Sequence, residues 1–154
     1  MESEADIPGH QRLVEAITSE GAVACLQLQH GGPGVSRSLI EGGVAVGPCD
    51  ISSRRDPGKL TARALTHEEI EELIECFGRS AELAIKAGYQ AIELHGAHGY
   101  LLTTFLSPLT NHRDDEWGGD MDRRLNFPRR VIERVKQALS LIHISEPTRP
   151  LSIS

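Results

Sequence analysis

Apolar residues recur every three or four positions over residues 66–88, which predicts an amphipathic helix of about five turns. Thr66 and Glu69 mark its start, because a threonine followed three positions later by a glutamate forms a capping box around the first amides of a helix. Gly88 supplies the left-handed residue at which such a helix ends. The inward face of this helix is expected to hold Ile70, Leu73, Ile74, Phe77, Ala81, Ala84 and Ile85.

Two further segments show a helical pattern. Residues 8–20 carry apolar side chains at mixed three- and four-residue spacing, at Leu13, Val14, Ala16 and Ile17. A last helix is expected within residues 121–139, and Pro128 favours a regular part that begins near Asn126. Its inward face is expected to hold Phe127, Val131, Ile132, Val135 and Leu139.

Two short apolar runs, residues 22–28 and 89–94, predict strands, and the first has the composition of a strand buried on both faces. The helix predicted over residues 66–88, Gly88 and the strand predicted over residues 89–94 follow one another through short connections, which is typical of parallel βα units. Residues 31–65 are rich in Gly, Pro, Ser and Arg and predict a long loop in which only residues 44–46 suggest a strand. The sequence therefore predicts an α/β fold with a parallel sheet, either a barrel or a doubly wound sheet.

Composition excludes several classes of protein without naming one. A net charge of -6 argues against electrostatic binding of nucleic acid or of an anionic membrane, since both need clustered Lys and Arg. Cys25, Cys49 and Cys76 form no CxxC pair, which favours reduced thiols without a metal role. The acidic start resembles no secretory signal and no apolar run approaches 18 residues, so a cytoplasmic protein is expected.

Candidate chemistry lies directly after the second predicted strand, at His95, His98 and Tyr100. In parallel α/β folds this carboxyl end is where ligands bind. Gly96 and Gly99 are expected to turn the chain so that the two histidines converge. Two imidazole N–H groups aimed at one oxygen would polarise a carbonyl, and a tyrosine that is protonated at neutral pH can act as a general acid.

Other interpretations of these residues remain open. The histidines could be ordinary loop residues that only satisfy local hydrogen bonds. They could also form a metal pair that is completed by His112, Asp114 or Asp115, as in a metal-dependent barrel hydrolase. No third ligand stands at a characteristic spacing, so no bound metal is expected.

The polar stretch 111–120 predicts a packed loop over the mouth of a barrel, because Trp117 is followed by two glycines. Asp114, Asp115 and Glu116 have the composition of a solvated acidic turn. Arg113 and Arg124 are expected to brace loops through carboxylates rather than to contact substrate.

Residues 88–127, with the strings IELHGAHGYLL and FLSPLTNHRDDEWGG, resemble the Old Yellow Enzyme family of FMN-dependent alkene reductases, and the resemblance extends over residues 6–139. It implies that His95 and His98 bind the carbonyl or nitro oxygen of a small-molecule substrate and that Tyr100 donates a proton. It also implies that Gln27 hydrogen-bonds the flavin ring and that NADH or NADPH is the reductant. The chain departs from the family pattern at residues 31–33, at Thr104 and at residues 122–124.

The family fold is a (β/α)8 barrel of around 250 residues, so the resemblance implies that residues 1–139 hold strands 3 and 4 with flanking helices and a long loop. Such a piece, with Gln27 as its single expected flavin contact, is expected to bind FMN weakly and to be inactive alone. A non-catalytic barrel remnant is the alternative. Residues 140–154 break the pattern, and residues 141–150 resemble a translated sequencing adapter, so this tail is expected to be non-native.

Overall fold

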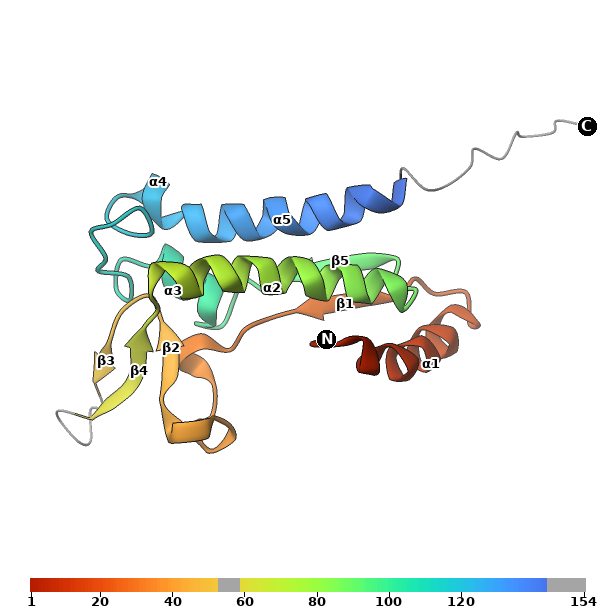
Figure 1. Ribbon diagram of the computed structural model, residues 1–154, viewed down its shortest axis with the longest axis horizontal. Coiled ribbons are helices and arrows are strands. Elements are labelled where there is room, and N and C mark those ends of the chain that lie inside the picture. The colour runs from red at the N-terminus through yellow and green to blue at the C-terminus, as the bar shows by residue number, and fades with distance from the viewer. Residues whose placement is uncertain (53–58, 144–154) are drawn as a thin grey trace, which may run out of the picture.

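The computed structural model describes residues 1–52 and 59–143 (Figure 1). The helices are α1 (Ile7–Thr18), α2 (His67–Lys86), α3 (Leu101–Leu106), α4 (Met121–Arg124) and α5 (Asn126–His143). The strands are β1 (Cys25–Leu28), β2 (Ala45–Gly47), β3 (Ile51–Ser52), β4 (Leu60–Ala64) and β5 (Ala91–Leu94). Short 3-10 turns cover Glu4–Asp6, Gly32–Gly34, Arg37–Leu39 and Glu41–Gly43.

Strands β1 and β5 form a parallel pair in which Leu26 lies opposite Ile92 and Gln27 opposite Glu93. Helix α2 packs along α5, and the two helices cover one side of this pair (Figure 1). The core between these layers is built from large apolar side chains, with Ile70, Leu101, Phe105, Trp117, Phe127 and Val131 fully buried. The predicted parallel βα arrangement is therefore confirmed.

The expectation that the first strand is buried on both faces is wrong. Cys25 and Gln27 are exposed, whereas Leu28 on the opposite face is buried. The reason is that the described residues place only two strands in this sheet, so that one face has no covering layer.

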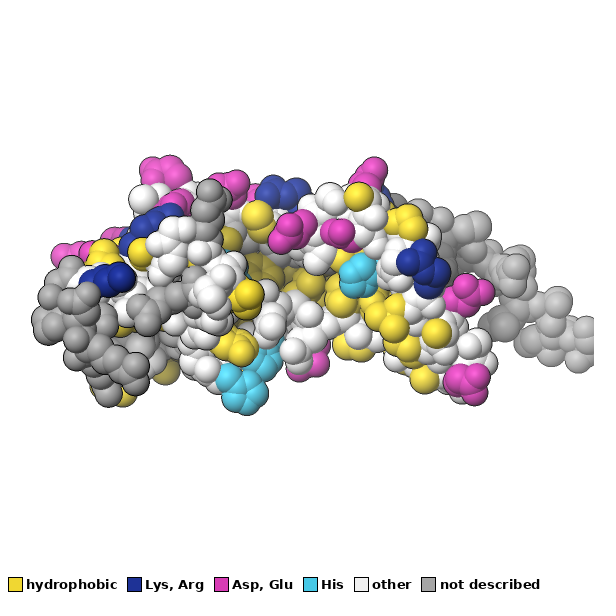
Figure 2. Space-filling view, turned by 90° about the horizontal axis from the view of Figure 1, so that it is seen from below, with side chains coloured by type: hydrophobic (Ala, Val, Ile, Leu, Met, Phe, Trp, Pro, Cys, Tyr) yellow, Lys and Arg dark blue, Asp and Glu magenta, His cyan; other side chains and the backbone are white. Residues whose placement is uncertain are grey.

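A cavity of about 590 Å³ runs beside β1 and α2 and is lined by Leu26, Phe77 and other residues. Figure 2 shows hydrophobic side chains gathered along the middle of one face.

Helix α2 begins where its sequence predicts. The Thr66 hydroxyl accepts the amide of Glu69 at 3.2 Å, and the Glu69 carboxylate accepts the amide of Thr66 at 2.9 Å. The same carboxylate binds the Arg63 guanidinium through two hydrogen bonds, of 2.6 and 2.8 Å. The Arg63 guanidinium, helped by the Thr66 amide, lowers the pKa of Glu69 from 4.5 to about 2.

Replacing Glu69 with glutamine should therefore change how stability depends on pH. A carboxylate whose pKa is lower in the folded state stabilises the fold above its unfolded pKa, and this stabilisation is lost as pH falls through the folded pKa. We expect Glu69→Gln to cost about 0.5 kcal/mol at pH 6, since the ion pair is partly exposed. The difference from the original protein should vanish between pH 4.5 and about 2. Urea unfolding at several pH values measures it, with exposed Glu72→Gln as control; a pH-independent difference would contradict the assignment.

Helix α5 begins at Asn126, as predicted, but its inward face differs at one position. Phe127, Val131 and Val135 are buried, whereas Ile132 is 49% exposed. Successive helical residues are rotated by about 100°, so Ile132 lies beside the stripe that faces α2 rather than within it. The helix also continues to His143, which corrects the expected break at residue 140; residues 144–154 of the expected tail lie outside the described residues.

The long loop at residues 31–65 contains more structure than its composition suggests. Strand β2, predicted at residues 44–46, pairs in parallel with β4, and β3 pairs antiparallel with β4 on its other side. This small sheet lies at the end of the molecule away from α1 (Figure 1). The sequence predicts loop at residues 51–52 and 60–64, because apolar and polar residues do not alternate clearly in either segment. The structure agrees with this weak pattern, since Ala62 is the only buried residue of β4.

Candidate active site

His95, His98 and Tyr100 lie in the loop between β5 and α3. The amide of His95 donates to the carbonyl of Leu28 at 2.9 Å and so ties the start of this loop to the end of β1. The chain then turns through two left-handed residues, His98 with φ 58° and Gly99 with φ 71°. Gly96, which was expected to share the turn, does not have a positive φ. A histidine in the left-handed region is strained relative to glycine, so the turn that places the His98 side chain costs conformational free energy.

The turn brings the three rings together, as the sequence predicts. The ring centroids of His95 and His98 lie 5.0 Å apart, and those of His95 and Tyr100 lie 5.3 Å apart. Nε2 of His95 and Nδ1 of His98 are 3.1 Å apart. Since neither nitrogen can donate and accept at once, one of the two carries the hydrogen and the other accepts it. His98 is exposed, and His95 and Tyr100 are half-buried, so the cluster is open to a ligand.

Tyr100 is held by the backbone around it. It precedes α3, and its carbonyl accepts the amide of Thr104 at 3.0 Å. Its own amide donates to the carbonyl of Ala97 at 3.1 Å, and the next amide, of Leu101, donates to the carbonyl of His30 at 3.0 Å. Tyr100 is thus fixed between the turn at 97–100 and the segment that follows β1.

Gln27 lies on the neighbouring strand rather than in the ring cluster. Its Cα partner is Glu93, which precedes His95 by two positions on β5. Gln27 is exposed on the uncovered face of the strand pair. An exposed side-chain amide offers both a donor and an acceptor, which fits the polar edge of a flavin ring.

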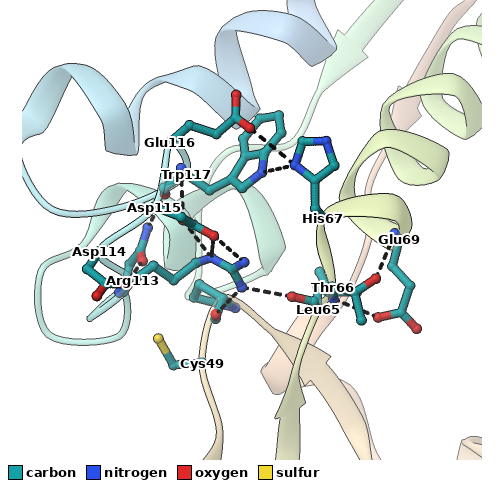
Figure 3. Close-up of polar contacts among 12 residues, drawn as sticks. Cys49, Leu65, Thr66, His67, Glu69, Arg113, Asp114, Asp115, Glu116 and Trp117 are labelled. Carbon is teal, nitrogen blue, oxygen red and sulfur yellow. Dashed lines mark hydrogen bonds and ion pairs between the residues drawn. The ribbon is translucent and has the colours of Figure 1, made fainter.

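The loop over residues 111–120 is packed, as its sequence predicts. The indole of Trp117 is fully buried, and Arg113 binds Asp115 through its guanidinium (Figure 3). The Arg113 guanidinium lowers the pKa of Asp115. The same guanidinium donates to the carbonyls of Pro48 and Leu65, so Arg113 joins this loop to the residues that follow the parallel strands β2 and β4.

One expectation for this region needs correction. Arg124 binds backbone carbonyls, of Leu106 and Gly119, rather than carboxylates. The acidic turn is solvent-exposed at Asp114, Asp115 and Glu116, as expected, and Asp115 also accepts the amide of Trp117 at 3.0 Å, while Glu116 lies 3.2 Å from Nδ1 of His67.

Nδ1 of His67 has two competing partners. The indole N–H of Trp117 donates to it at 3.1 Å, which requires Nδ1 to carry no hydrogen. The Glu116 carboxylate can only accept, so its contact at 3.2 Å requires the opposite state (Figure 3). Nδ1 of His67 can therefore hydrogen-bond only one of these neighbours at a time. The sequence pattern predicts neither hydrogen bond.

The described part of the chain offers no other cluster of metal-ligating side chains. Over residues 1–52 and 59–143, no three His, Cys, Asp or Glu side chains lie close enough together to hold a metal ion. No helix in these ranges has the length and apolarity needed to cross a membrane. The three ring side chains after β5 therefore remain the candidate site.

Comparisons with known proteins agree on one family. Residues 1–145 match the model of the NADH:flavin oxidoreductase / NADH oxidase family. The chain is 44% identical over 137 residues to the "Probable NADH-dependent flavin oxidoreductase YqiG" of Bacillus subtilis, covering 89% of this chain and 36% of that protein. It is 44% identical over 126 residues to cinnamate reductase of Clostridium sporogenes, covering 81% of this chain and 19% of that protein.

A solved structure gives the same result for the fold. Morphinone reductase in complex with tetrahydroNAD superposes with a TM-score of 0.80 at 28% identity, covering 88% of this chain and 41% of that one. The predicted partial (β/α)8 barrel and the resemblance to the Old Yellow Enzyme family are confirmed. The chain spans less than half the length of these relatives. It belongs to the NADH:flavin oxidoreductase / NADH oxidase family.

Proposed function

We propose that this chain is a segment of an FMN-dependent oxidoreductase that passes hydride from NADH or NADPH, through the flavin, to an activated alkene. The family match supports a flavin and a nicotinamide reductant. The names of two relatives, cinnamate reductase and NADH:acrylate oxidoreductase, point to alkenes conjugated to a carboxyl group. Because the chain covers 36% of its B. subtilis relative, the activity is proposed for the complete enzyme that contains it.

The observation that carries this proposal is the ring cluster at the carboxyl end of β5. Nε2 of His95 and Nδ1 of His98 lie 3.1 Å apart, with the Tyr100 ring beside them, and the His98 side chain is exposed. A substrate oxygen that enters between the nitrogens can accept from both only if each carries a hydrogen. One ring must then change tautomer or gain a proton, and the histidine–histidine hydrogen bond is exchanged for two bonds to substrate.

This exchange favours the transition state over the bound substrate. A hydrogen bond between neutral groups contributes about 0.5–1.5 kcal/mol net, so the loss of one such bond offsets part of the gain with a neutral carbonyl. Bonds to an oxygen that carries negative charge are about twice as strong. His95 and His98 therefore stabilise most strongly the charge that develops on that oxygen as hydride adds to the alkene, and Tyr100 delivers the proton to the α carbon.

The residues present fit only part of a flavin site. Gln27 has the chemistry to hydrogen-bond the ring, and its exposed position on β1 leaves it accessible. The flavin, when bound, supplies the hydride. Gln27 orients the ring from the strand adjacent to β5, and the remaining contacts are assigned to parts of the enzyme beyond this chain.

The function is tested on the complete enzyme under anaerobic conditions. NADH or NADPH should bleach the flavin absorbance, and one equivalent of an α,β-unsaturated carbonyl compound should restore it. The 154-residue chain alone should lose added FMN on gel filtration, because Gln27 is the single flavin contact assigned to it. Stoichiometric zinc without flavin in the complete enzyme would instead support a barrel hydrolase, and bound flavin that no alkene reoxidises would overturn the proposal.

A further inference from the structure

The ring of Tyr100 rests against a glycine that follows the other strand. A Cβ atom added to Gly34 would lie 3.0 Å from Cδ1 and 3.1 Å from Cε1 of Tyr100. Both distances are shorter than ordinary van der Waals contact between carbons, about 3.5–4.0 Å. Gly34 does not have a positive φ, so its backbone conformation would accept other residues. The adjacent phenol ring, rather than the backbone, accounts for the absence of a side chain here.

The turn that carries Gly34 cannot easily move away from the ring. Gly32 has φ 53°, and a Cβ atom there would lie 2.9 Å from Cα of Leu101, so the turn is in close contact with the first residue of α3. Pro33 packs on Gly47 of β2, where an added Cβ would lie 2.8 Å from Cγ of the proline. The turn is therefore held between α3 and the small sheet.

His30 joins this turn to the start of α3 through two hydrogen bonds. Its carbonyl accepts the amide of Leu101 at 3.0 Å, and its Nδ1 accepts the amide of Gly32 at 3.1 Å. Burial lowers the pKa of His30, so the ring stays neutral at neutral pH and Nδ1 remains an acceptor. The distance between the turn and Tyr100 is thus fixed by bonds from one residue.

We propose that Gly34 is a positioning residue, whose missing side chain sets where the Tyr100 ring lies relative to His95 and His98. The inference rests on the proposed function, in which Tyr100 is the proton donor. Proton transfer needs donor and carbon within hydrogen-bonding reach, and a displacement of about 1 Å can cost up to 10²-fold in rate.

The contact is tested first on the chain itself by NMR of tyrosine ring signals. The chain has two tyrosines, and Tyr89 is an internal reference because it is buried beside His10 in a separate cluster. Gly34→Ala should move the ring signals of Tyr100 and leave those of Tyr89 unchanged. Gly9→Ala in α1, where the added methyl meets only the Arg12 guanidinium at 4.0 Å, is the matched control and should move neither. Unchanged Tyr100 signals in Gly34→Ala would overturn the proposal.

The effect on chemistry is tested by a double-mutant cycle in the complete enzyme. Gly34→Ala should slow alkene reduction about 10-fold while flavin reduction by NADH or NADPH is unchanged. In the Tyr100→Phe background the same substitution should change the rate less than about 2-fold, since a residue that acts through Tyr100 loses its effect when the hydroxyl is gone. Equal effects in both backgrounds would overturn the positioning role alone. A Tyr100→Phe enzyme with undiminished alkene reduction would overturn the proposed function as well.

Discussion

Replacing Tyr100 with phenylalanine in the complete enzyme should slow alkene reduction by about 10²- to 10⁴-fold, the usual contribution of a positioned general acid. The ring remains in phenylalanine, so its packing against Gly34 and its centroid distance of 5.3 Å from His95 should change little. Only the hydroxyl proton is lost. Reduction of the flavin by NADH or NADPH needs no proton from this group and should keep its rate, as stopped-flow absorbance of the two half-reactions can measure.

The other tyrosine provides a matched control. The hydroxyl of Tyr89 lies 2.9 Å from Nδ1 of His10, and Tyr89 precedes β5 at the end opposite to His95. Tyr89→Phe removes the same atom from a part-buried structural bond and should cost about 1 kcal/mol of stability without affecting either half-reaction. If Tyr100→Phe slows both half-reactions equally, the phenol is not the proton donor of the alkene step.

The place of the site follows from the sequence, but its internal bonds do not. His95 stands directly after a predicted strand, and parallel strands present their carboxyl ends at a common edge. That rule is enough to locate the ring cluster. The hydrogen bond between His95 and His98 depends on which residues of the turn are left-handed, and the pattern of glycines indicated Gly96 where the structure uses His98. The contact of Gly34 with Tyr100 joins loops from different strands, and local spacing carries no signal for it.

The fold shows the same division between local and long-range information. Helix α2 was predicted closely because capping and periodicity act within a few residues. Strand β4 was missed because its residues are mostly small or partly exposed, and its pairing with β2 and β3 is what makes it a strand. Ile132 was assigned to the core because periodicity alone does not define how wide the buried stripe of a helix is.

Trp117 should be among the side chains whose loss destabilises the fold most. It is fully buried in the core that α2 and α5 share, its indole donates to Nδ1 of His67 at 3.1 Å, and the guanidinium of Arg130 lies 5.3 Å from its ring centroid. Its carbonyl accepts the side-chain amide of Asn111 at 2.8 Å. Trp117→Ala empties this volume, and large aromatic-to-alanine changes in a core cost about 3–5 kcal/mol. Urea unfolding followed by far-UV circular dichroism measures the loss of stability. Tryptophan fluorescence cannot be used, because the substitution removes the only tryptophan of the chain.

A phenylalanine at the same position separates the volume of the ring from its hydrogen bond. Trp117→Phe keeps most of the apolar contact and removes the indole N–H, which leaves Nδ1 of His67 available to donate to Glu116. Because this alternative partner is already 3.2 Å away, His67 is not left unsatisfied, and we expect a loss of about 1–2 kcal/mol. In the Trp117→Phe background, His67→Ala should still destabilise the fold, because it removes the bond to Glu116 that has replaced the indole bond. No further loss from His67→Ala in that background would mean that His67 does not switch between its two neighbours, and an equal loss in the Trp117→Phe and Trp117→Ala variants would mean that the hydrogen bond, rather than packing, anchors this loop.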